Sequence, residues 1–249
     1  LEPGDTTGLP ELVPVIFLTN EVITRTEDTE AFAENLLRLT DELLPTGYRE
    51  LQLDCDWTAR TQVPYFALLR AVRTLRPGLR LTCTVRLHQY RDRREQGIPP
   101  VERATLMAYN TGNLEDWATE NTILDTNAIS AYLAGQSPYP LPLDLGVAVY
   151  DWAAVYRRGE LAYLINEPDL TELADSVRFT PLDSLRYEVA RSTYLDGIYL
   201  YQGDRLRREV VGPTLLDEQT ARLRRFVDYF PGQRRIVYRL GSRLWREPH

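Results

Sequence analysis

The sequence predicts an α/β protein of the (β/α)8 barrel type, in which parallel strands alternate with helices. Short apolar segments of strand length alternate with amphipathic segments of helical period, as they do in successive βαβ units. The apolar segments are nearly continuous, which is typical of parallel strands that are covered on both faces. The length of 249 residues suits one barrel of this type, which commonly has about 250 residues.

Six apolar segments are expected to form the barrel strands, because each has strand length and is bounded by polar, Gly or Pro residues. They are residues 12–19, 50–56, 79–88, 104–109, 143–150 and 235–240. Helices are expected where apolar residues recur at helical spacing, at residues 29–44, 63–75, 123–133 and 215–229. Pro and Gly residues that follow three of these helices mark where they end.

A closed barrel of this kind has eight strands, two more than the six expected here. The chain, residues 1–249, is therefore interpreted as one barrel domain that is N-terminally incomplete, with its first two strands before Leu1. An atypical barrel is the alternative. Residues 185–211 contain two short strand-like segments, 187–190 and 197–201, which are expected to form a small β-hairpin inserted into the barrel.

The composition excludes several kinds of function. The 29 basic and 36 acidic residues give a net charge of −7, so no nucleic-acid partner is expected. All basic residues are Arg, which removes every mechanism that needs a lysine. Two histidines, His88 and His249, and two cysteines, Cys55 and Cys83, are too few for a multi-histidine or four-cysteine zinc site, so zinc is not expected. No cofactor is expected either. No run of about 18 apolar residues predicts a membrane span.

Polar side chains are concentrated on two neighbouring predicted strands. Side chains alternate along a strand, so Asp54 and Asp56 share one face of the first, and Arg86 and His88 share one face of the second. Active sites of barrels lie at the carboxyl ends of the strands, so these polar faces are expected to meet inside the barrel near its mouth. Arg86 is the expected counter-ion of the carboxylates. A buried ion pair without a functional role is the alternative.

The segment LQLDCDWT, residues 51–58, resembles the D-x-x-D-x-D-x-E strand of glycoside hydrolase family 18, the chitinase-like barrels. Asp54 and Asp56 match the second and third Asp, whereas Leu51 replaces the first Asp and Thr58 stands where the family has its catalytic Glu. The segment MAYN, residues 107–110, resembles the M-x-Y-[DN] segment of the same family.

A second likeness is to an uncharacterised bacterial family of barrels with an Asp-x-Asp strand. That family also has a Leu-His-Gln element, which matches residues 87–89, and a Tyr-Asn-x-Gly turn, which matches residues 109–112. This likeness implies no particular activity.

The family 18 resemblance implies a carbohydrate-active barrel and an exported protein, either periplasmic or at the cell surface. In that family the Glu protonates the leaving oxygen while the acetamido group of the substrate attacks, oriented by an Asp and a Tyr. The resemblance and the strand positions together imply four catalytic candidates, which are Asp54, Asp56, Tyr109 and His88. His88 is expected to act as a proton shuttle or sugar ligand.

Thr58 cannot donate a proton as Glu does, so several interpretations stay open. One is a glycosidase with a displaced acid, for which Asp56, Glu115, Asp116 and Asp151 are candidates. Another is a catalytically inactive barrel that binds a glycan or a protein. A third is an unrelated hydrolase that acts through Asp54, Asp56 and a divalent cation.

Eight further residues are expected to contact a polysaccharide or oligosaccharide partner, because they lie at or near the ends of predicted strands. They are Trp57, Arg86, Gln89, Asn110, Tyr150, Asp151, Trp152 and Tyr201. The aromatic rings among them offer flat faces to the apolar faces of sugars, with packing in the core or in loops as the alternative for each. We also expect the two aspartates, 54 and 56, to lie close to residues 109 and 110. The sequence does not indicate an oligomeric state.

Overall fold

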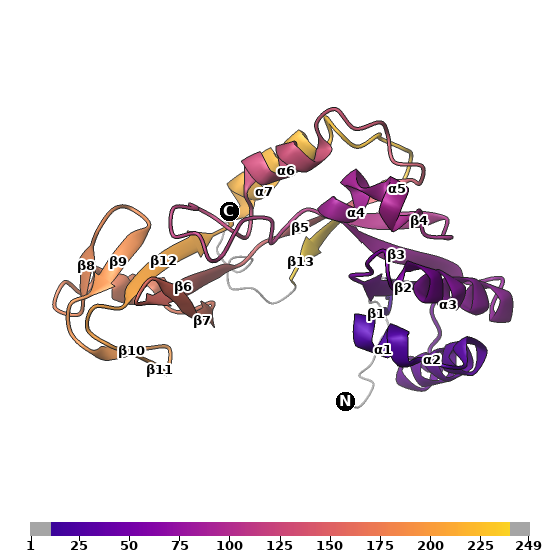
Figure 1. The fold of residues 1–249 in the computed structure, drawn as a ribbon, viewed down its shortest axis with the longest axis horizontal. Helices are drawn as coiled ribbons and strands as arrows, with labels where there is room; N and C mark the ends of the chain where they lie inside the picture. Colours follow the sequence, from indigo (N-terminus) through magenta and orange to yellow (C-terminus); the bar gives the residue numbers. More distant parts are fainter. Residues whose placement is uncertain (1–10, 240–249) are drawn as a thin grey trace. The chain divides into compact units, whose positions relative to one another are not determined.

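The structure is a computed structural model that describes residues 11–239, so His249 lies outside the described residues. The chain divides into two compact units. The first unit comprises Leu1–Met107, Tyr132–Leu145 and Phe226–Arg234, and the second comprises Ala108–Ala131, Gly146–Arg225 and Arg235–His249. Figure 1 shows the parallel strands β1 to β4 of the first unit and the antiparallel strands of the second.

A parallel sheet with the strand order β1-β2-β3-β4-β5-β13 contains all six predicted barrel strands. Its strands are β1 Val15–Leu18, β2 Glu50–Cys55, β3 Arg80–Arg86, β4 Arg103–Met107, β5 Leu143–Ala148 and β13 Arg235–Tyr238. In the parallel register, Phe17 of β1 lies opposite Asp54 of β2, and Thr84 of β3 lies opposite Thr105 of β4. The α/β class and the six-stranded parallel sheet are therefore confirmed, and the closed eight-stranded barrel stays a prediction.

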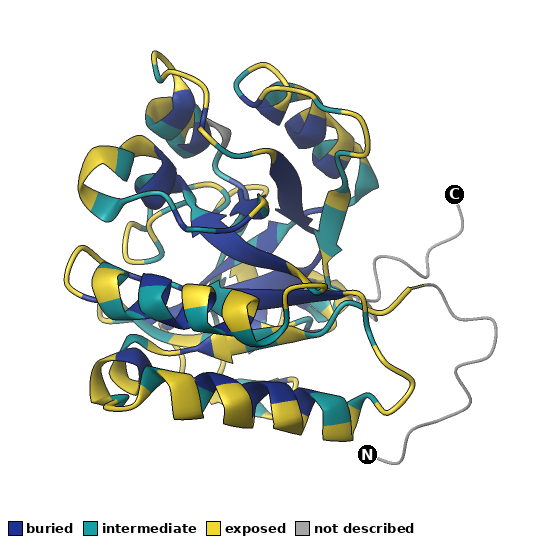
Figure 2. Cartoon of the chain, turned by 90° about the vertical axis from the view of Figure 1, so that its right-hand side faces the viewer, coloured by how far each residue is buried: buried dark blue, intermediate teal, exposed yellow. Residues whose placement is uncertain are grey.

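Seven α-helices occur in the described part of the chain. They are α1 Asn20–Arg25, α2 Thr29–Leu43, α3 Gln62–Leu75, α4 Leu87–Arg91, α5 Arg93–Gln96, α6 Thr126–Leu133 and α7 Pro213–Leu223. Helix α2 begins after Asp28, whose carboxylate accepts hydrogen bonds from the N–H groups of Glu30 and Ala31. Helices α2 and α3 each carry buried residues on one side and exposed residues on the other (Figure 2).

The first five predicted strands end one or two residues too late, and at the end of β3 this difference matters because a helix follows. The predicted strand 79–88 ends at Arg86, and helix α4 begins at Leu87. The reason is a local cap: the side-chain oxygen of Gln89 accepts a hydrogen bond of 2.7 Å from the N–H of Arg86 and so starts a helix. The alternation of a strand therefore does not place His88 on the face of Arg86.

The apolar core of the first unit contains both cysteines as free thiols. Cys55 of β2 and Cys83 of β3 are buried, at 1% and 0% exposure. Burial raises the pKa of both thiols, to about 12 for Cys55. An aromatic group of Trp57, Tyr65 and Phe66 packs in the same unit, with ring centroids 5.4–6.0 Å apart.

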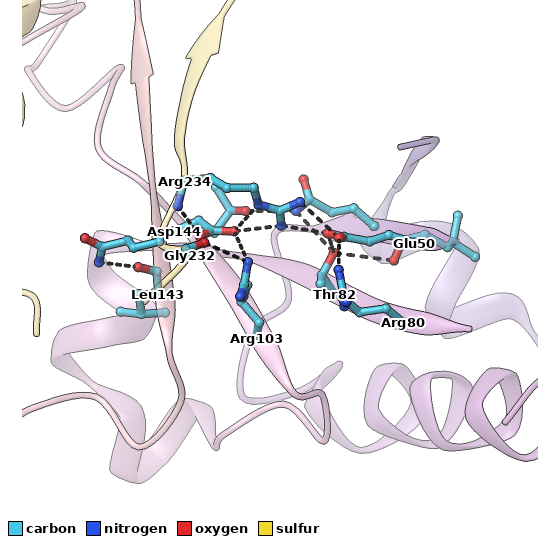
Figure 3. Close-up of polar contacts among 12 residues, drawn as sticks. Glu50, Arg80, Thr82, Arg103, Leu143, Asp144, Gly232 and Arg234 are labelled. Carbon is cyan, nitrogen blue, oxygen red and sulfur yellow. Dashed lines mark hydrogen bonds and ion pairs between the residues drawn. The ribbon is translucent and has the colours of Figure 1, made fainter. Parts of the chain in front are cut away.

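A network of charged side chains lies at the amino ends of the parallel strands of the first unit (Figure 3). Glu50, the first residue of β2, and Asp144, in β5, are 2% and 0% exposed. Arg234 donates to both oxygens of Glu50, at 2.7 and 3.0 Å, and to Asp144 at 2.7 Å. Arg80 and Arg103 add contacts of 3.4 Å to Glu50 and 3.6 Å to Asp144. We call these five residues the amino-end network.

The second unit contains a five-stranded antiparallel sheet with the order β7-β6-β12-β9-β8 and a separate hairpin, β10-β11. The strands are β6 Asp151–Arg157, β7 Glu160–Asn166, β8 Phe179–Pro181, β9 Arg186–Val189, β10 Thr193–Leu195, β11 Ile198–Leu200 and β12 Arg205–Val210, and a 3-10 helix spans Leu170–Ala174. The two segments predicted to form a hairpin, 187–190 and 197–201, do not pair with each other: the first lies in β9, which pairs with β12 and β8, and the second in β11, which pairs with β10. Strands β6, β7 and β8 extend the antiparallel region well before residue 185.

Candidate functional site

The candidate site of the first unit is built on the carboxyl ends of β2 and β3. Asp56 follows directly after β2, and Arg86 is the last residue of β3. Their side chains form a two-pronged ion pair, with Nε–Oδ1 at 2.5 Å and Nη2–Oδ2 at 2.9 Å. Arg86 is thus the counter-ion of Asp56, one of the two carboxylates for which the sequence predicted this role. The side chains of Arg86 and Asp56 are 28% and 40% exposed, so the pair remains open to a ligand.

Asp54 lies on the same strand, two residues before Asp56, and accepts a hydrogen bond of 2.6 Å from the hydroxyl of Thr84. Burial raises the pKa of Asp54, and the negative charge of Asp56 adds to this effect. The hydrogen bond from Thr84 and the charge of Arg86 oppose it. The net upward direction means that Asp54 holds a proton more readily than an ordinary aspartate, as a general acid must.

Asn20 is a site residue that the sequence did not single out. It is the first residue of α1, two residues after the end of β1, and its side-chain amide donates a 2.8 Å hydrogen bond to the backbone oxygen of Asp56. Its side-chain oxygen accepts a 2.5 Å bond from the hydroxyl of Thr61. Asn20 therefore ties the end of β1 to the turn that carries Asp56.

Thr58, at the position of the family's catalytic Glu, is exposed and lies in the turn before α3. Its N–H donates to the hydroxyl of Thr61 at 2.9 Å, and its own hydroxyl lies 3.3 Å from the same oxygen. These bonds give Thr58 a role in holding the turn that precedes the helix.

Trp57 and Gln89 are fully buried, at 0% exposure. The indole N–H of Trp57 donates to the backbone oxygen of Gln96 at 2.9 Å, and its ring stacks on Tyr65. Gln89 donates to the backbone oxygen of Trp57 at 2.8 Å while it accepts from the N–H of Arg86. Both side chains therefore support the turns that carry Asp56 and Arg86, and Trp57 adopts the packing role that was its alternative.

His88 is half-buried in α4. Burial lowers the pKa of its imidazole, and the charge of Arg86 acts in the same direction, whereas the charges of Asp56 and Asp92 oppose them. The net downward direction leaves His88 neutral at pH 7, able to accept a proton or a hydrogen bond.

In the second unit, a cluster of aromatic rings and one asparagine side chain is formed by residues that follow β4 and β5, by one residue of β6 and by the last residue of β13. The hydroxyl of Tyr150 donates to the side-chain oxygen of Asn110. Tyr109 stacks on Tyr238 with ring centroids 5.6 Å apart and planes 4° apart. Tyr150 meets Tyr238 and Trp152 edge-on, at 6.0 and 5.4 Å. We call these five residues the tyrosine cluster. Tyr238, which is 47% exposed, was not predicted as a site residue.

Asn110 is held in a constrained backbone conformation, with φ at +52°, a region that asparagine enters more readily than most residues. Its N–H donates to the oxygen of Ile123 at 2.7 Å. Burial raises the pKa of Tyr150 above its usual range, so its hydroxyl stays protonated and remains a donor to Asn110. The exposed Asn110 side chain is thereby oriented in advance of any ligand.

The two remaining candidates lie in the antiparallel region of the second unit. Asp151, the first residue of β6, is 2% exposed. Tyr201, after β11, is 53% exposed, with the guanidinium of Arg157 4.3 Å from its ring centroid and Tyr199 edge-on at 5.0 Å.

The structure thus brings together Asp54, Asp56, Arg86, Gln89 and Trp57 within the first unit. Within the second unit it brings together Tyr109, Asn110, Tyr150 and Trp152. The expected proximity of residues 54 and 56 to residues 109 and 110 stays a prediction. In residues 11–239 no group of three or more His, Cys, Asp or Glu side chains is placed to hold a metal ion. None of the helices described is long and apolar enough to cross a membrane.

No protein-family model matches the chain, and no curated protein matches it in sequence. Solved structures do match. The spore cortex-lytic enzyme SleL of Bacillus cereus has a TM-score of 0.52 and 15% identity, covering 94% of this chain and 58% of SleL. YdhD of Bacillus subtilis, described as a sporulation-specific glycosylase, has a TM-score of 0.53 and 15% identity, covering 86% of this chain and 77% of YdhD. The chain shares the fold of family 18-type glycoside hydrolases.

A chitinase is also among the matches. Catalytic domain 2 of the Group II chitinase of Ostrinia furnacalis has a TM-score of 0.49 and 11% identity, covering 88% of this chain and 66% of that one. The fold that this chain shares with SleL and YdhD confirms, at the level of the fold, the resemblance inferred from residues 51–58 and 107–110. The chain spans 58% of SleL, the first of these structures.

Proposed function

We propose that the chain is part of a carbohydrate-active, glycoside hydrolase-like protein that binds and cleaves a polysaccharide containing N-acetylated sugars. The observation that carries this proposal is the pair of carboxyl groups at the end of β2, within a fold shared with family 18-type enzymes. Asp54 has a raised pKa and Asp56 is ion-paired with Arg86. Two neighbouring carboxyl groups in different environments are what acid-assisted glycoside hydrolysis uses.

The two carboxyl groups suit different tasks. A protonated Asp54 suits proton donation to the glycosidic oxygen, so that the bond from that oxygen to C1 breaks as the acetamido oxygen of the substrate bonds to C1. Asp56, held by Arg86, suits a hydrogen bond from the acetamido N–H that orients this attack. Water then attacks C1, opens the ring formed with the acetamido group and returns a proton to the carboxylate.

The tyrosine cluster supports sugar binding by the second unit. Stacked Tyr109 and Tyr238 offer aromatic surface, and Asn110, fixed by Tyr150, offers amide donors beside it. Such a combination of flat apolar surface and a preset polar group suits a sugar ring, which has apolar faces and polar edges.

A binding protein without catalysis is the second candidate, and Thr58 favours it. The hydroxyl of Thr58 contacts Thr61 in a turn, and threonine supplies no carboxylic acid. Such a protein would retain Asp56, Arg86 and the tyrosine cluster as contacts for a glycan.

Glycan binding and cleavage can be measured separately on the same protein. The chain is titrated calorimetrically with N-acetylglucosamine oligomers and with soluble peptidoglycan fragments, and release of reducing ends is followed in parallel. We expect binding, and we expect Asp56→Asn to weaken it about tenfold or more, because a charged hydrogen-bond acceptor is lost.

Asp41→Asn is the matched control. Asp41 forms the same two-pronged pair with Arg76, at 2.6 and 2.8 Å, with similar exposure of 43% and 38%. This pair lies away from the strand ends, because Asp41 is on α2 and Arg76 directly follows α3. Cleavage that Asp56→Asn abolishes and Asp41→Asn preserves supports the hydrolase. Binding without cleavage supports the second candidate. Absence of both across the panel overturns the proposal.

A further inference from the structure

The second unit contains a cavity of about 400 Å³ whose lining residues belong to none of the sites described above. Three of them lie on β6, β12 and β9, which are neighbours in the antiparallel sheet (Figure 1). Arg205 lies opposite both Tyr156 and Glu188, so these three side chains share one face of the sheet. The other lining residues are Trp117, Arg158, Gly159 and Gly203. The volume is in the range of small-molecule sites.

Trp117 and Tyr156 form an aromatic wall of this cavity. Their rings meet edge-on, with centroids 4.9 Å apart. The hydroxyl of Tyr156 donates to the backbone oxygen of Leu114 at 2.6 Å. The guanidinium of Arg186 lies 5.5 Å from the indole ring and donates to the backbone oxygen of Trp117 at 3.1 Å. Both rings are therefore held in place before a ligand arrives, as in a preformed binding site.

Two arginines of the same lining have donors that the protein leaves unused. The side chain of Arg205 is 54% exposed and lies 3.6 Å from the carboxylate of Glu188, which is too long for a hydrogen bond. The exposed side chain of Arg158 forms no hydrogen bond, ion pair or ring contact with any residue in the range 11–239. Two arginines and one glutamate make the lining positive in a chain whose net charge is −7. The cavity is therefore suited to an anionic group.

The backbone conformation at Arg158 is unfavourable for an arginine. Arg158 and Gly159 form the two-residue turn between β6 and β7, with φ of +55° and +89°. Turns with two positive φ values favour Asn followed by Gly, because asparagine enters this region more readily than arginine does. The turn therefore tolerates strain at a residue whose side chain lines the cavity, which is a feature of functional sites.

We propose that this cavity binds a sugar unit that carries a carboxylate. Arg158 and Arg205 hold the carboxylate, since guanidinium groups bind carboxylates through paired N–H donors. The aromatic wall contacts the apolar face of the sugar ring. The choice of a sugar rests on the proposed function, whereas the negative charge of the ligand follows from the cavity alone. The site would make the protein prefer an acidic polysaccharide to a neutral one.

A titration with two sugars that differ in one group tests the proposal. N-acetylmuramic acid is N-acetylglucosamine with an added lactyl ether, which carries a carboxylate. NMR follows the amides of Gly159 and Gly203 in the cavity, with Gly47 of the first unit as reference. We expect both amides to shift saturably with N-acetylmuramic acid, and N-acetylglucosamine to bind about tenfold more weakly or less. Comparable binding of the two sugars, or no shift with either, overturns the proposal. Tighter binding of glucose 6-phosphate than of glucuronic acid assigns the cavity to phosphate and also overturns it.

Variants of the lining give an independent readout. Arg158→Asn removes the guanidinium and supplies the residue that the turn favours, so binding of N-acetylmuramic acid should fall about tenfold without a lower melting temperature. Arg191→Asn removes an exposed arginine of the same unit outside the cavity and is the matched control. Because Glu188 competes with the ligand for Arg205, Glu188→Gln should tighten binding several-fold. Binding that Arg158→Asn leaves unchanged, or that Glu188→Gln weakens, contradicts the proposal.

Asp56→Asn separates this cavity from the proposed function. All lining residues of the cavity belong to the second unit, and Asp56 belongs to the first. The shifts of Gly159 and Gly203 with N-acetylmuramic acid should therefore be the same in Asp56→Asn as in the unsubstituted chain. If the unsubstituted chain cleaves no oligomer and these shifts still occur, the proposed function is contradicted and the cavity keeps its ligand. Shifts that disappear in Asp56→Asn assign the sugar to the first unit and overturn the proposal.

Discussion

The two ends of the parallel strands in the first unit use the same residue types in opposite ways. At the amino ends, Glu50 and Asp144 are enclosed and share Arg234. At the carboxyl ends, Asp56 has its ion pair with Arg86, and both side chains keep a solvent-exposed part. Exposure, rather than charge, therefore separates a stabilising carboxylate from one that is available to a ligand.

Removing a carboxylate from the amino-end network is expected to have the largest effect. Asp144→Ala deletes acceptors for the N–H and the Nε of Arg234, at 2.8 and 2.7 Å, and leaves that arginine with only Glu50 in the network. We expect the free energy of unfolding to fall by about 3–5 kcal/mol, measured by urea denaturation. A loss below about 1 kcal/mol would show that the network contributes little.

Acid is expected to weaken the same network. Burial on its own would raise the pKa of Glu50, but the hydrogen bonds and charge of Arg234 outweigh it and hold the pKa below its usual value of 4.5. Because the pKa of Glu50 is lowered in the folded state, its contribution to stability is complete above the unfolded-state pKa. This contribution is lost as the pH falls through the folded-state pKa. Glu50→Gln should therefore cost about 1–3 kcal/mol at neutral pH and flatten the loss of stability below pH 4.5. Unfolding curves at several pH values measure both effects. If the stability of Glu50→Gln falls with acid as steeply as that of the unsubstituted protein, the lowered pKa of Glu50 is contradicted.

Asp54 is expected to change the stability with pH in the opposite direction to Glu50. Its raised folded-state pKa means that the ionised form destabilises the fold, and protonation relieves this as the pH falls from neutral through the folded-state pKa. Asp54→Asn keeps an acceptor for Thr84 and removes the charge, so it should raise the unfolding free energy at neutral pH by up to about 1 kcal/mol. Thermal melts at pH 7 and in mild acid check this, and the gain should shrink in acid. A loss of stability at neutral pH would refute it.

At the carboxyl ends of the strands, Asp56→Asn is expected to have the smallest effect on folding. The Asp56–Arg86 pair is partly exposed, so its removal should lower the unfolding free energy by less than about 1 kcal/mol, while glycan binding falls. Urea denaturation of this variant beside Asp144→Ala separates the two ends of the strands. A cost as large as that of Asp144→Ala would make Asp56 a structural residue.

The sequence predicted the parallel sheet because its strands are continuous apolar runs between helical segments. It missed β6, although Gly159 lies in the tight turn that follows, because the run from Asp151 to Arg157 is buried on both faces and shows no alternation. A pattern of apolar and polar residues cannot distinguish such a strand from a helix of the same length.

The candidate site was predictable only where a single strand determines it. Asp54 and Asp56 follow from the period of β2. Asn20 and Tyr238 do not, because each acts through a partner far away in the chain, such as the backbone of Asp56, 36 residues from Asn20. The position of His88 was misjudged because the hydrogen bond from Arg86 to Gln89 starts a helix that periodicity does not reveal.

The two buried thiols can be used to detect unfolding of the protein. Cys55 and Cys83 are sealed from solvent, and their raised pKa values leave almost no reactive thiolate at neutral pH. An alkylating reagent will therefore label a molecule only while its first unit is open. The rate of labelling therefore reports the opening of the first unit without any engineered probe.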